Sequence, residues 1–440
     1  MAVASPLPHP DAEAGGMFRS LRGFNYRTWA IGAFISNVGT WMQRTAQDWL
    51  VLTELTHRNA SAVGVVMALQ FGPQALLLPF TGYAADHLDR RKLVFVTQTV
   101  LGLLALGLGL LTVTHTVRLW HVYVFAFLLG SAAAFDAPAR NAFISELVTE
   151  ADLTNAVGLN STSFNAARMI GPAIAGLLIT AVGTGWVFLL NAASFIAVLI
   201  AVSLLRKQEL RGEKRPARKP GGMIEGFRYV SRRGDLMAIL VMGFLVGTFG
   251  LNFPIFISTM AVTVFHRGAG QFGLLTSIMA VGTVTGALLA ARRRRPHIIF
   301  LVAGAALFGV GLAVAACMPS YGLFGAALVL IGAAAQTFTT TSNSVLQISS
   351  DPQMRGRVVA LFLAVVMGST PIGAPIVGRV ADAFGPRWSL AVGAAAGLIA
   401  ALVGLRYVLA HGQLRVERRG GRWHFELDED RPAAERAAAR

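Results

Sequence analysis

The segment "GYAADHLDRRKLVF", residues 82–95, places a carboxylate and a basic cluster between two long apolar runs. Asp86 lies four residues after Gly82, and Arg90, Arg91 and Lys92 follow closely. The apolar run on each side has about 20 residues, the length that an α-helix needs to cross the core of a bilayer. We therefore interpret the segment as a short turn between two membrane-spanning helices.

The whole chain has the composition of a membrane protein. Of its 440 residues, 54% are hydrophobic and 14% are charged, whereas about 25% of residues in soluble domains are charged. A soluble protein of this composition would expose large apolar patches, and the period-two alternation of a membrane β-barrel is absent. The sequence predicts an all-α membrane protein with twelve transmembrane helices, near residues 28–52, 60–82, 93–113, 119–136, 154–181, 185–205, 236–263, 270–291, 297–317, 321–342, 356–382 and 387–410.

Basic residues lie almost entirely on one side of these spans. An even number of spans puts both tails on one side, and that side has thirty Arg and Lys residues against four on the other. Because basic loops stay in the cytoplasm, we expect a multi-pass protein of the bacterial plasma membrane with both termini cytoplasmic. This topology accounts for the net charge of +16. The sequence does not show the basic face with stacking aromatic residues that would indicate nucleic-acid binding.

The spans and loops divide the chain into five segments. Separately, Met17 is a candidate start of the natural protein. The segments are an N-terminal tail at 1–27, a six-helix bundle at 28–205, a basic linker at 206–235, a second six-helix bundle at 236–410 and a C-terminal tail at 411–440.

The two halves of the chain resemble each other. Aligned on Gly82 and Gly286, "GYAADHLDRR" meets "GALLAARRRR", and Ala290 takes the position of Asp86. A weak repeat over two groups of six spans is typical of transporters built from two related bundles, with the substrate site near the bilayer midplane between them. We therefore predict two pseudo-symmetric six-helix bundles.

With these features the chain resembles the major facilitator superfamily along almost its whole length. Residues 82–92 match that superfamily's loop signature, except that His87 stands where a basic residue is usual and Asp89 where Gly is usual. The loop, together with "TWMQRTAQDWLVL", "FDAPARNAFISELV" and "DPQMRGRVVAL", is similar to the enterobactin-exporter-like and multidrug efflux branch.

The resemblance implies a monomeric secondary transporter without cofactors that works by alternating access. In the superfamily, the loop acid meets the start of the eleventh helix when the cytoplasmic side is closed. The same contact in this chain would bring Asp86 close to Arg355 and Arg357. Gly82, Arg90 and Arg91 belong to the same gating loop.

A second signature lies in the expected fifth span. Proton-coupled antiporters of the superfamily have a Gly- and Pro-containing motif there, and Gly158, Gly171, Pro172 and Gly176 occupy four of its positions. We favour this interpretation over ordinary packing of small residues between helices. The Arg that proton-coupled drug exporters usually have in the fourth span is replaced by Ala126, so their proton relay is not transferred to this chain.

Ionisable residues inside the spans are candidates for function, because each is costly unless it is paired or faces water. Arg44 and Asp48 lie four residues apart on one helix face and can pair. Asp48 is either part of a structural pair near the headgroups or the carboxylate that takes up and releases a proton. In the second case, Arg44 would tune the pKa of Asp48 or bind an anionic substrate. Arg168 faces a cavity or extends to the interface. Asp136 and Arg140 form a gate pair or contact substrate.

Uncharged polar residues complete the candidate cavity: Asn37, Gln43, Gln47, Gln70, Asn160, Asn165, Asn252, Gln336, Thr340 and Asn343. With nearby phenylalanines they suit a small amphipathic molecule. We expect proton-coupled efflux of drug-like compounds or siderophores, the alternative being proton-coupled uptake of a small polar metabolite. A primary pump driven by ATP would need a Gly-rich phosphate-binding loop that ends in Lys-Ser or Lys-Thr. No Lys in this chain is followed by Ser or Thr, so the chain has no such loop. No metal motif or histidine cluster indicates an enzyme.

Overall fold

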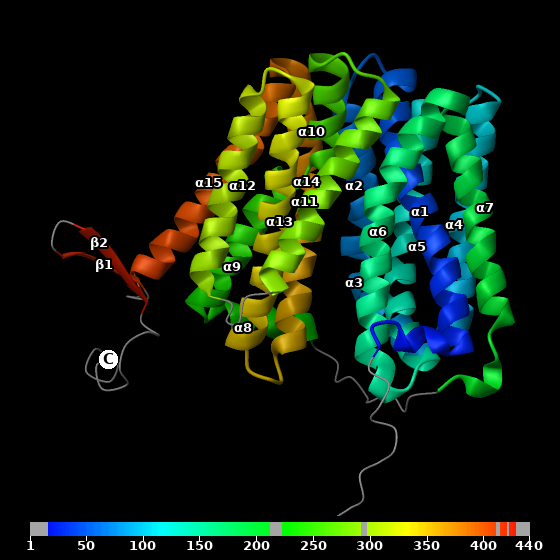
Figure 1. Ribbon diagram of the computed structural model, residues 1–440, viewed down its shortest axis with the longest axis horizontal. Helices are drawn as coiled ribbons and strands as arrows, with labels where there is room; N and C mark the ends of the chain where they lie inside the picture. The colour runs from blue at the N-terminus through cyan, green and yellow to red at the C-terminus, as the bar shows by residue number, and fades with distance from the viewer. Residues whose placement is uncertain (1–15, 212–221, 292–296, 411–413, 420–421, 428–440) are drawn as a thin grey trace, which may run out of the picture.

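Figure 1 shows two helix bundles side by side, each built from one half of the chain. The computed structural model describes residues 16–211, 222–291 and 297–410, together with two C-terminal strands. The first bundle contains η1 (Arg19–Arg22), α1 (Phe24–Trp49), η2 (Leu50–Leu55), α2 (Ala60–Leu76), α3 (Leu78–His87), α4 (Arg90–Val113), α5 (Leu119–Leu147), α6 (Glu150–Val182) and α7 (Thr184–Leu204).

The second bundle follows a linker that contains η3 (Lys207–Glu209) and α8 (Gly222–Ser231). It contains α9 (Gly234–Leu245), η4 (Val246–Gly250), α10 (Phe253–Thr259), η5 (Met260–Val264), α11 (Ala269–Ala291), α12 (Ile298–Cys317), α13 (Tyr321–Ser349), α14 (Arg355–Phe384) and α15 (Pro386–Ala410). An antiparallel hairpin of β1 (Leu414–Arg419) and β2 (Arg422–Leu427) comes after α15.

The helices lie where the sequence predicts the spans. Within the described residues, ten helical segments are long and apolar enough to cross a membrane. The first and second predicted spans correspond to α1, which is rich in polar residues, and to α2 with α3, which are interrupted at Leu77. This arrangement fits the count of twelve. The all-α prediction is confirmed for both bundles, whereas the hairpin β1–β2 was not predicted.

Proline is found at the breaks in two spans. Pro73 lies inside α2, four residues before the break at Leu77. The seventh span is interrupted at Leu251 and Asn252, directly before the short helix that contains Pro254. Proline has no backbone N–H and its ring clashes with the preceding turn, so it ends or bends a helix.

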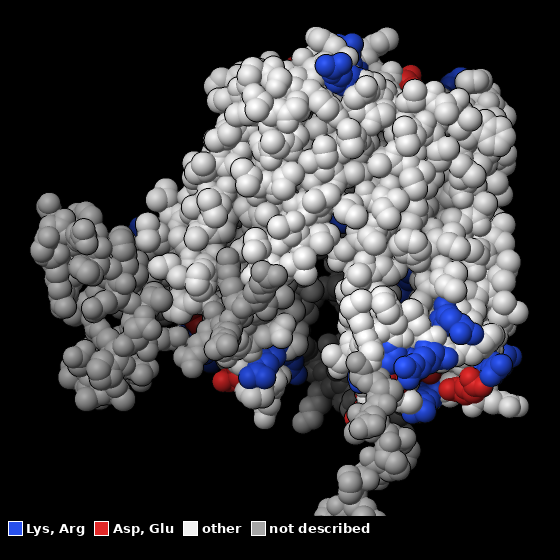
Figure 2. Space-filling view, in the orientation of Figure 1, with Lys and Arg blue, Asp and Glu red and all other residues white. Residues whose placement is uncertain are grey.

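Charged side chains gather at one end of the bundles (Figure 2). We call this the basic end; it carries η1 and α8, and the opposite end is the far end. Figure 2 also shows the molecule hollowed between the two bundles toward the basic end.

The opening segment of the sequence ties three helices together at the basic end. Arg90 forms an ion pair with Glu146 on α5 at 3.2 Å, and Arg91 Nη2 donates to the carbonyl of Val202 on α7 at 2.8 Å. Asp89 accepts from the backbone N–H of Lys92 at 3.1 Å and so caps α4. The basic cluster therefore has structural partners in addition to its charge.

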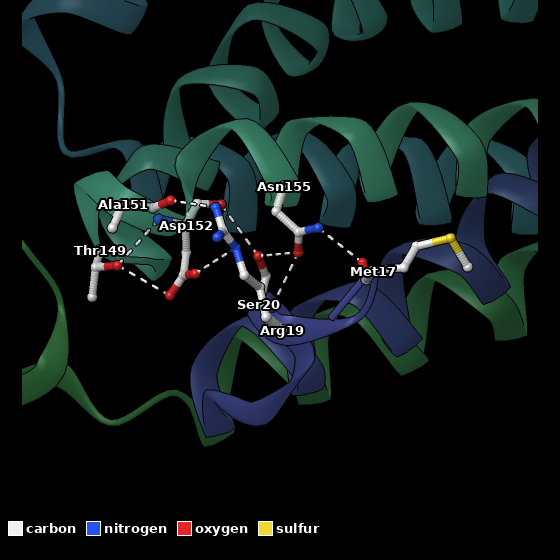
Figure 3. Close-up of polar contacts among 7 residues, drawn as sticks. All are labelled: Met17, Arg19, Ser20, Thr149, Ala151, Asp152 and Asn155. Atoms are coloured by element: carbon white, nitrogen blue, oxygen red, sulfur yellow. Dashed lines mark hydrogen bonds and ion pairs between the residues drawn. The ribbon is translucent and has the colours of Figure 1, made fainter. Parts of the chain in front are cut away.

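The turn η1 is fixed to the start of α6 (Figure 3). Arg19 Nε lies 3.0 Å from a carboxylate oxygen of Asp152, and Ser20 Oγ donates to Asn155 Oδ1 at 2.7 Å. Asn155 Nδ2 donates in turn to the Met17 carbonyl at 2.8 Å. Residues 19–22 of the predicted tail at 1–27 thus form a turn that packs on the first bundle, and its last residues, 24–27, belong to α1.

Candidate functional site

Two adjoining cavities lie inside the molecule. The central cavity, of about 500 Å³, lies between the bundles, and the first-bundle cavity, of about 450 Å³, lies within the first bundle. Both are lined by Arg44, Gln70, Phe71, Gln74 and Phe164.

Both halves of the chain build the central cavity. Residues from α1, α2 and α6 form one wall, and residues from α10, α11, α13 and α14 form much of the other. The lining is largely apolar and includes Phe253, Phe272 and Phe362. Gln336 and Asn343 on α13 add amide groups. An apolar cavity with a few polar groups is the usual form of a small-molecule site.

Two guanidinium groups in the central cavity contact the same aromatic ring. The Cζ atoms of Arg44 on α1 and Arg168 on α6 lie 4.9 Å and 5.6 Å from the centroid of the Trp41 ring. The face of an indole ring attracts a cation, and both arginines are half-buried. Neither guanidinium forms a hydrogen bond or an ion pair with another described residue, so the cavity holds two positive charges that no carboxylate contacts directly.

Asp48 lies one helical turn after Arg44 and contributes a carboxylate to the central cavity. No other acidic residue is found among the described residues that line this cavity. Arg44 does not form the predicted ion pair with Asp48; its guanidinium lies over Trp41 instead. Asp48 is half-buried and accepts no hydrogen bond from the part of the chain that the structure describes.

Asp136 occupies the first-bundle cavity and has several partners there. It accepts hydrogen bonds from Thr97 Oγ1 at 2.7 Å and Gln98 Nε2 at 2.8 Å, both on α4. Arg140, one turn later, lies 3.7 Å from its second oxygen and donates to Asn37 Oδ1 at 3.1 Å. All these partners belong to the first bundle, so in this conformation Asp136 and Arg140 do not join the two bundles.

The uncharged candidates fall into four groups. Asn37, Gln43, Gln47, Asn160 and Asn165 line the first-bundle cavity, Gln336 and Asn343 line the central cavity, and Gln70 lines both. Asn252 and Thr340 line neither. The Asn252 amide donates to the Thr248 carbonyl at 2.8 Å, next to the break in the seventh span. It therefore satisfies a backbone carbonyl at the end of a helical segment.

The bundles touch each other closely at the far end. A β-carbon added to Gly273 on α11 would lie 2.2 Å from the Pro172 carbonyl oxygen on α6. One added to Gly64 on α2 would lie 2.4 Å from the Ala374 carbonyl oxygen on α14. Only glycine permits backbones to approach this closely, so these contacts close the central cavity on the far side.

The residues of the predicted antiporter motif have different surroundings. Gly171 packs against α1, where an added β-carbon would lie 2.6 Å from Trp41 Cβ, and Gly176 packs against Ala269 and Gly270 of α11. Pro172 supplies the carbonyl that faces Gly273. A β-carbon added to Gly158 would meet no described atom within 4 Å, so helix packing does not require glycine there.

The predicted gating residues do not form one cluster in this conformation. Arg357 forms an ion pair with Glu225 on α8 at 2.8 Å, and Arg355 Nε donates to the Ser350 carbonyl at 3.3 Å. A β-carbon added to Gly82 would meet no described atom within 4 Å. The side chain of Asp86 lies outside the described residues, so its contact with the start of α14 stays a prediction.

Sequence reasoning missed several polar residues of the site. Thr97 and Gln98 hold Asp136, and Asn191 Nδ2 donates to Gln43 Oε1 from α7. A lone amide in an otherwise apolar span was the available signal for Gln98 and Asn191. Asp382 near the end of α14 was not among the candidates either; it accepts from the backbone N–H groups of residues 60 and 61 at the start of α2.

The sequence matches the family of transmembrane secretion effectors over residues 16–430. The chain is 26% identical to the staphyloferrin A transporter of Staphylococcus aureus, over 80% of this chain and 88% of that protein. It is 28% identical to the multidrug efflux pump Tap of Mycolicibacterium fortuitum, over 80% and 88%. It is 26% identical to the enterobactin exporter of Citrobacter koseri, over 82% and 86%.

Solved structures share the fold at low sequence identity. A bacterial homologue of the human lysosomal transporter Spinster, described as inward-facing and unoccupied, superposes with a TM-score of 0.69 and 16% identity, over 87% of this chain and 97% of that one. A mutant form of the nucleoside transporter NupG superposes with a TM-score of 0.71 and 12% identity, over 87% and 99%.

Proposed function

The chain belongs to the transmembrane secretion effector family of the major facilitator superfamily, and from this membership we propose that it exports small amphipathic molecules from bacteria. One observation carries the proposal: a largely apolar cavity lies between the bundles, is closed at the far end and holds a free carboxylate beside two guanidinium groups. The efflux proteins among its relatives support the outward direction.

The orientation of the protein follows from its charge. The basic end lies in the cytoplasm and both tails are on that side, because loops rich in Arg and Lys are retained there. In this orientation the hollow between the bundles opens to the cytoplasm (Figure 2). The structure then represents the state in which an exporter collects its substrate.

The charges of the central cavity narrow the substrate class. Two arginines face one carboxylate, so a permanently cationic compound meets net positive charge. Uncharged amphipathic molecules, or those that carry both an acidic and a basic group, fit the cavity better. Such molecules include drug-like compounds and siderophores, in line with the names of the relatives.

Asp48 couples export to the proton gradient in this proposal. It binds a proton when the cavity opens to the far side and releases it to the cytoplasm when the cavity opens to the basic end. Arg44 and Arg168 keep the site charged in both states. Rocking of the two bundles about the central cavity exposes Asp48 to each side in turn.

Transport in everted membrane vesicles tests the direction and the coupling. Vesicles acidified inside are expected to accumulate labelled staphyloferrin A or enterobactin only when they contain the protein, and a proton ionophore should abolish the accumulation. Gradient-driven accumulation confined to right-side-out vesicles would contradict export and favour uptake by symport.

A further inference from the structure

The start of α2 receives two caps from two different parts of the molecule. Asn59, the residue before the helix, accepts a hydrogen bond from the Ala62 N–H at 2.9 Å. Asp382 accepts from the Ala60 N–H at 2.7 Å and from the Ser61 N–H at 2.9 Å, and the Ser61 hydroxyl also donates to it. Asn59 is local, whereas Asp382 belongs to α14 in the other bundle.

The contact is favourable for electrostatic reasons as well as geometric ones. The first N–H groups of a helix have no partner within the helix, and the helix dipole makes this end attractive to a carboxylate. Asp382 therefore satisfies two groups that would otherwise bond to water. The carboxylate is exposed at the far end, so water can replace it when the bundles separate.

The two bundles also pack closely at the same place. A β-carbon added to Gly378, one turn before Asp382, would lie 2.6 Å from the Ala60 carbonyl oxygen. Gly64, one turn into α2, faces Ala374 in the same way. Any movement that opens the far end between α2 and α14 must therefore break all the hydrogen bonds to Asp382.

We propose that Asp382 is a gating residue of the far end. Its carboxylate holds α2 against α14 while the central cavity is open to the basic end, and it releases α2 when the cavity opens to the far side. The inference rests on the alternating access of the proposed function, because a rigid-body rotation of the bundles is what breaks this contact. Asp382 positions the helices and does not contact the substrate.

Spin labels on the far end can test this role. One label attaches to Cys317, the natural and exposed cysteine at the end of α12, and the other to Thr116→Cys between α4 and α5. Double electron–electron resonance spectroscopy then measures the distance between the two labels, one on each bundle, in protein reconstituted without substrate. With Asp382→Ala, the ratio of far-open to far-closed molecules should rise by roughly two- to fivefold, as expected for one carboxylate at a helix start.

The matched control is Asn59→Ala, which removes a cap from the same helix without touching the other bundle. It should lower the melting temperature but leave the distance distribution unchanged. Asp382→Asn keeps one acceptor oxygen and should shift the distribution less than Asp382→Ala. An unchanged distribution in both Asp382 variants, or an equal shift in Asn59→Ala, would overturn the gating role. Because no transport is measured, this outcome is separate from success or failure of the export proposal.

Discussion

An Asp48→Asn variant is expected to lose gradient-driven efflux completely while it still folds and inserts. The amide has nearly the same size as the carboxylate but cannot bind and release a proton. Asp48 accepts no hydrogen bond from a described residue, so the replacement breaks no contact of that kind. In everted vesicles the variant should show no accumulation above background. Exchange of labelled for unlabelled substrate at equal concentrations should continue and should become independent of pH.

Asp136→Asn is the matched control, because it neutralises the carboxylate of the neighbouring cavity. Asp136 is held by Thr97, Gln98 and Arg140 within the first bundle. Losing a charged partner of buried hydrogen bonds costs about 1.5–3 kcal/mol, so this variant should melt at a lower temperature and still couple transport to protons. The reverse result, with coupling lost in Asp136→Asn and kept in Asp48→Asn, would show that the proton site lies in the first-bundle cavity.

The fold could be predicted from the sequence almost entirely, because the bilayer restricts the solutions. Apolar runs of about 20 residues have to be helices, and the loop of residues 82–95 with its weak copy after Gly286 indicates two related bundles. The interruptions at Leu77 and Leu251 were less visible. Proline can bend a helix or end it, and the surrounding packing decides between the two. The hairpin near the C-terminus had a signal that the prediction overlooked: residues 414–419 and 422–427 largely alternate apolar and polar side chains on either side of a Gly-Gly pair, a pattern typical of a β-hairpin.

The site could be predicted only in part. Ionisable residues in the spans are rare, and this pointed to Asp48, Arg44, Arg168 and Asp136. The partners of these residues could not be predicted, because they depend on how the helices pack: Trp41 receives both Arg44 and Arg168. Asp382 resembles any polar residue at a helix end until the structure shows which helix start it meets.

The largest conformational effect is expected from Gly273→Ala on α11. The added methyl group would lie 2.2 Å from the Pro172 carbonyl oxygen and 3.1 Å from Gly176 Cα, distances that α6 and α11 can relieve only by moving apart. Overpacking of this kind costs about 1–3 kcal/mol, and about 1.4 kcal/mol corresponds to a tenfold change in a ratio of states. The far-open population should therefore rise by roughly tenfold, measured with the labels on Cys317 and Thr116→Cys, and efflux should fall because the cavity spends less time open to the cytoplasm.

Gly270→Ala separates this steric effect from the effect of alanine on the helix itself. It lies on the same helix, one turn earlier, and its added β-carbon would meet its nearest atom, Thr180 Oγ1, at 3.7 Å, an ordinary contact. Alanine favours a helix over glycine by about 1 kcal/mol, so Gly270→Ala should be at least as stable as the parent and should keep its distance distribution and efflux. If the two alanine variants behaved alike, the close approach of α6 and α11 would not control the far end. A shift in Gly273→Ala alone would identify the contact between Pro172 and Gly273 as the point at which the two bundles close.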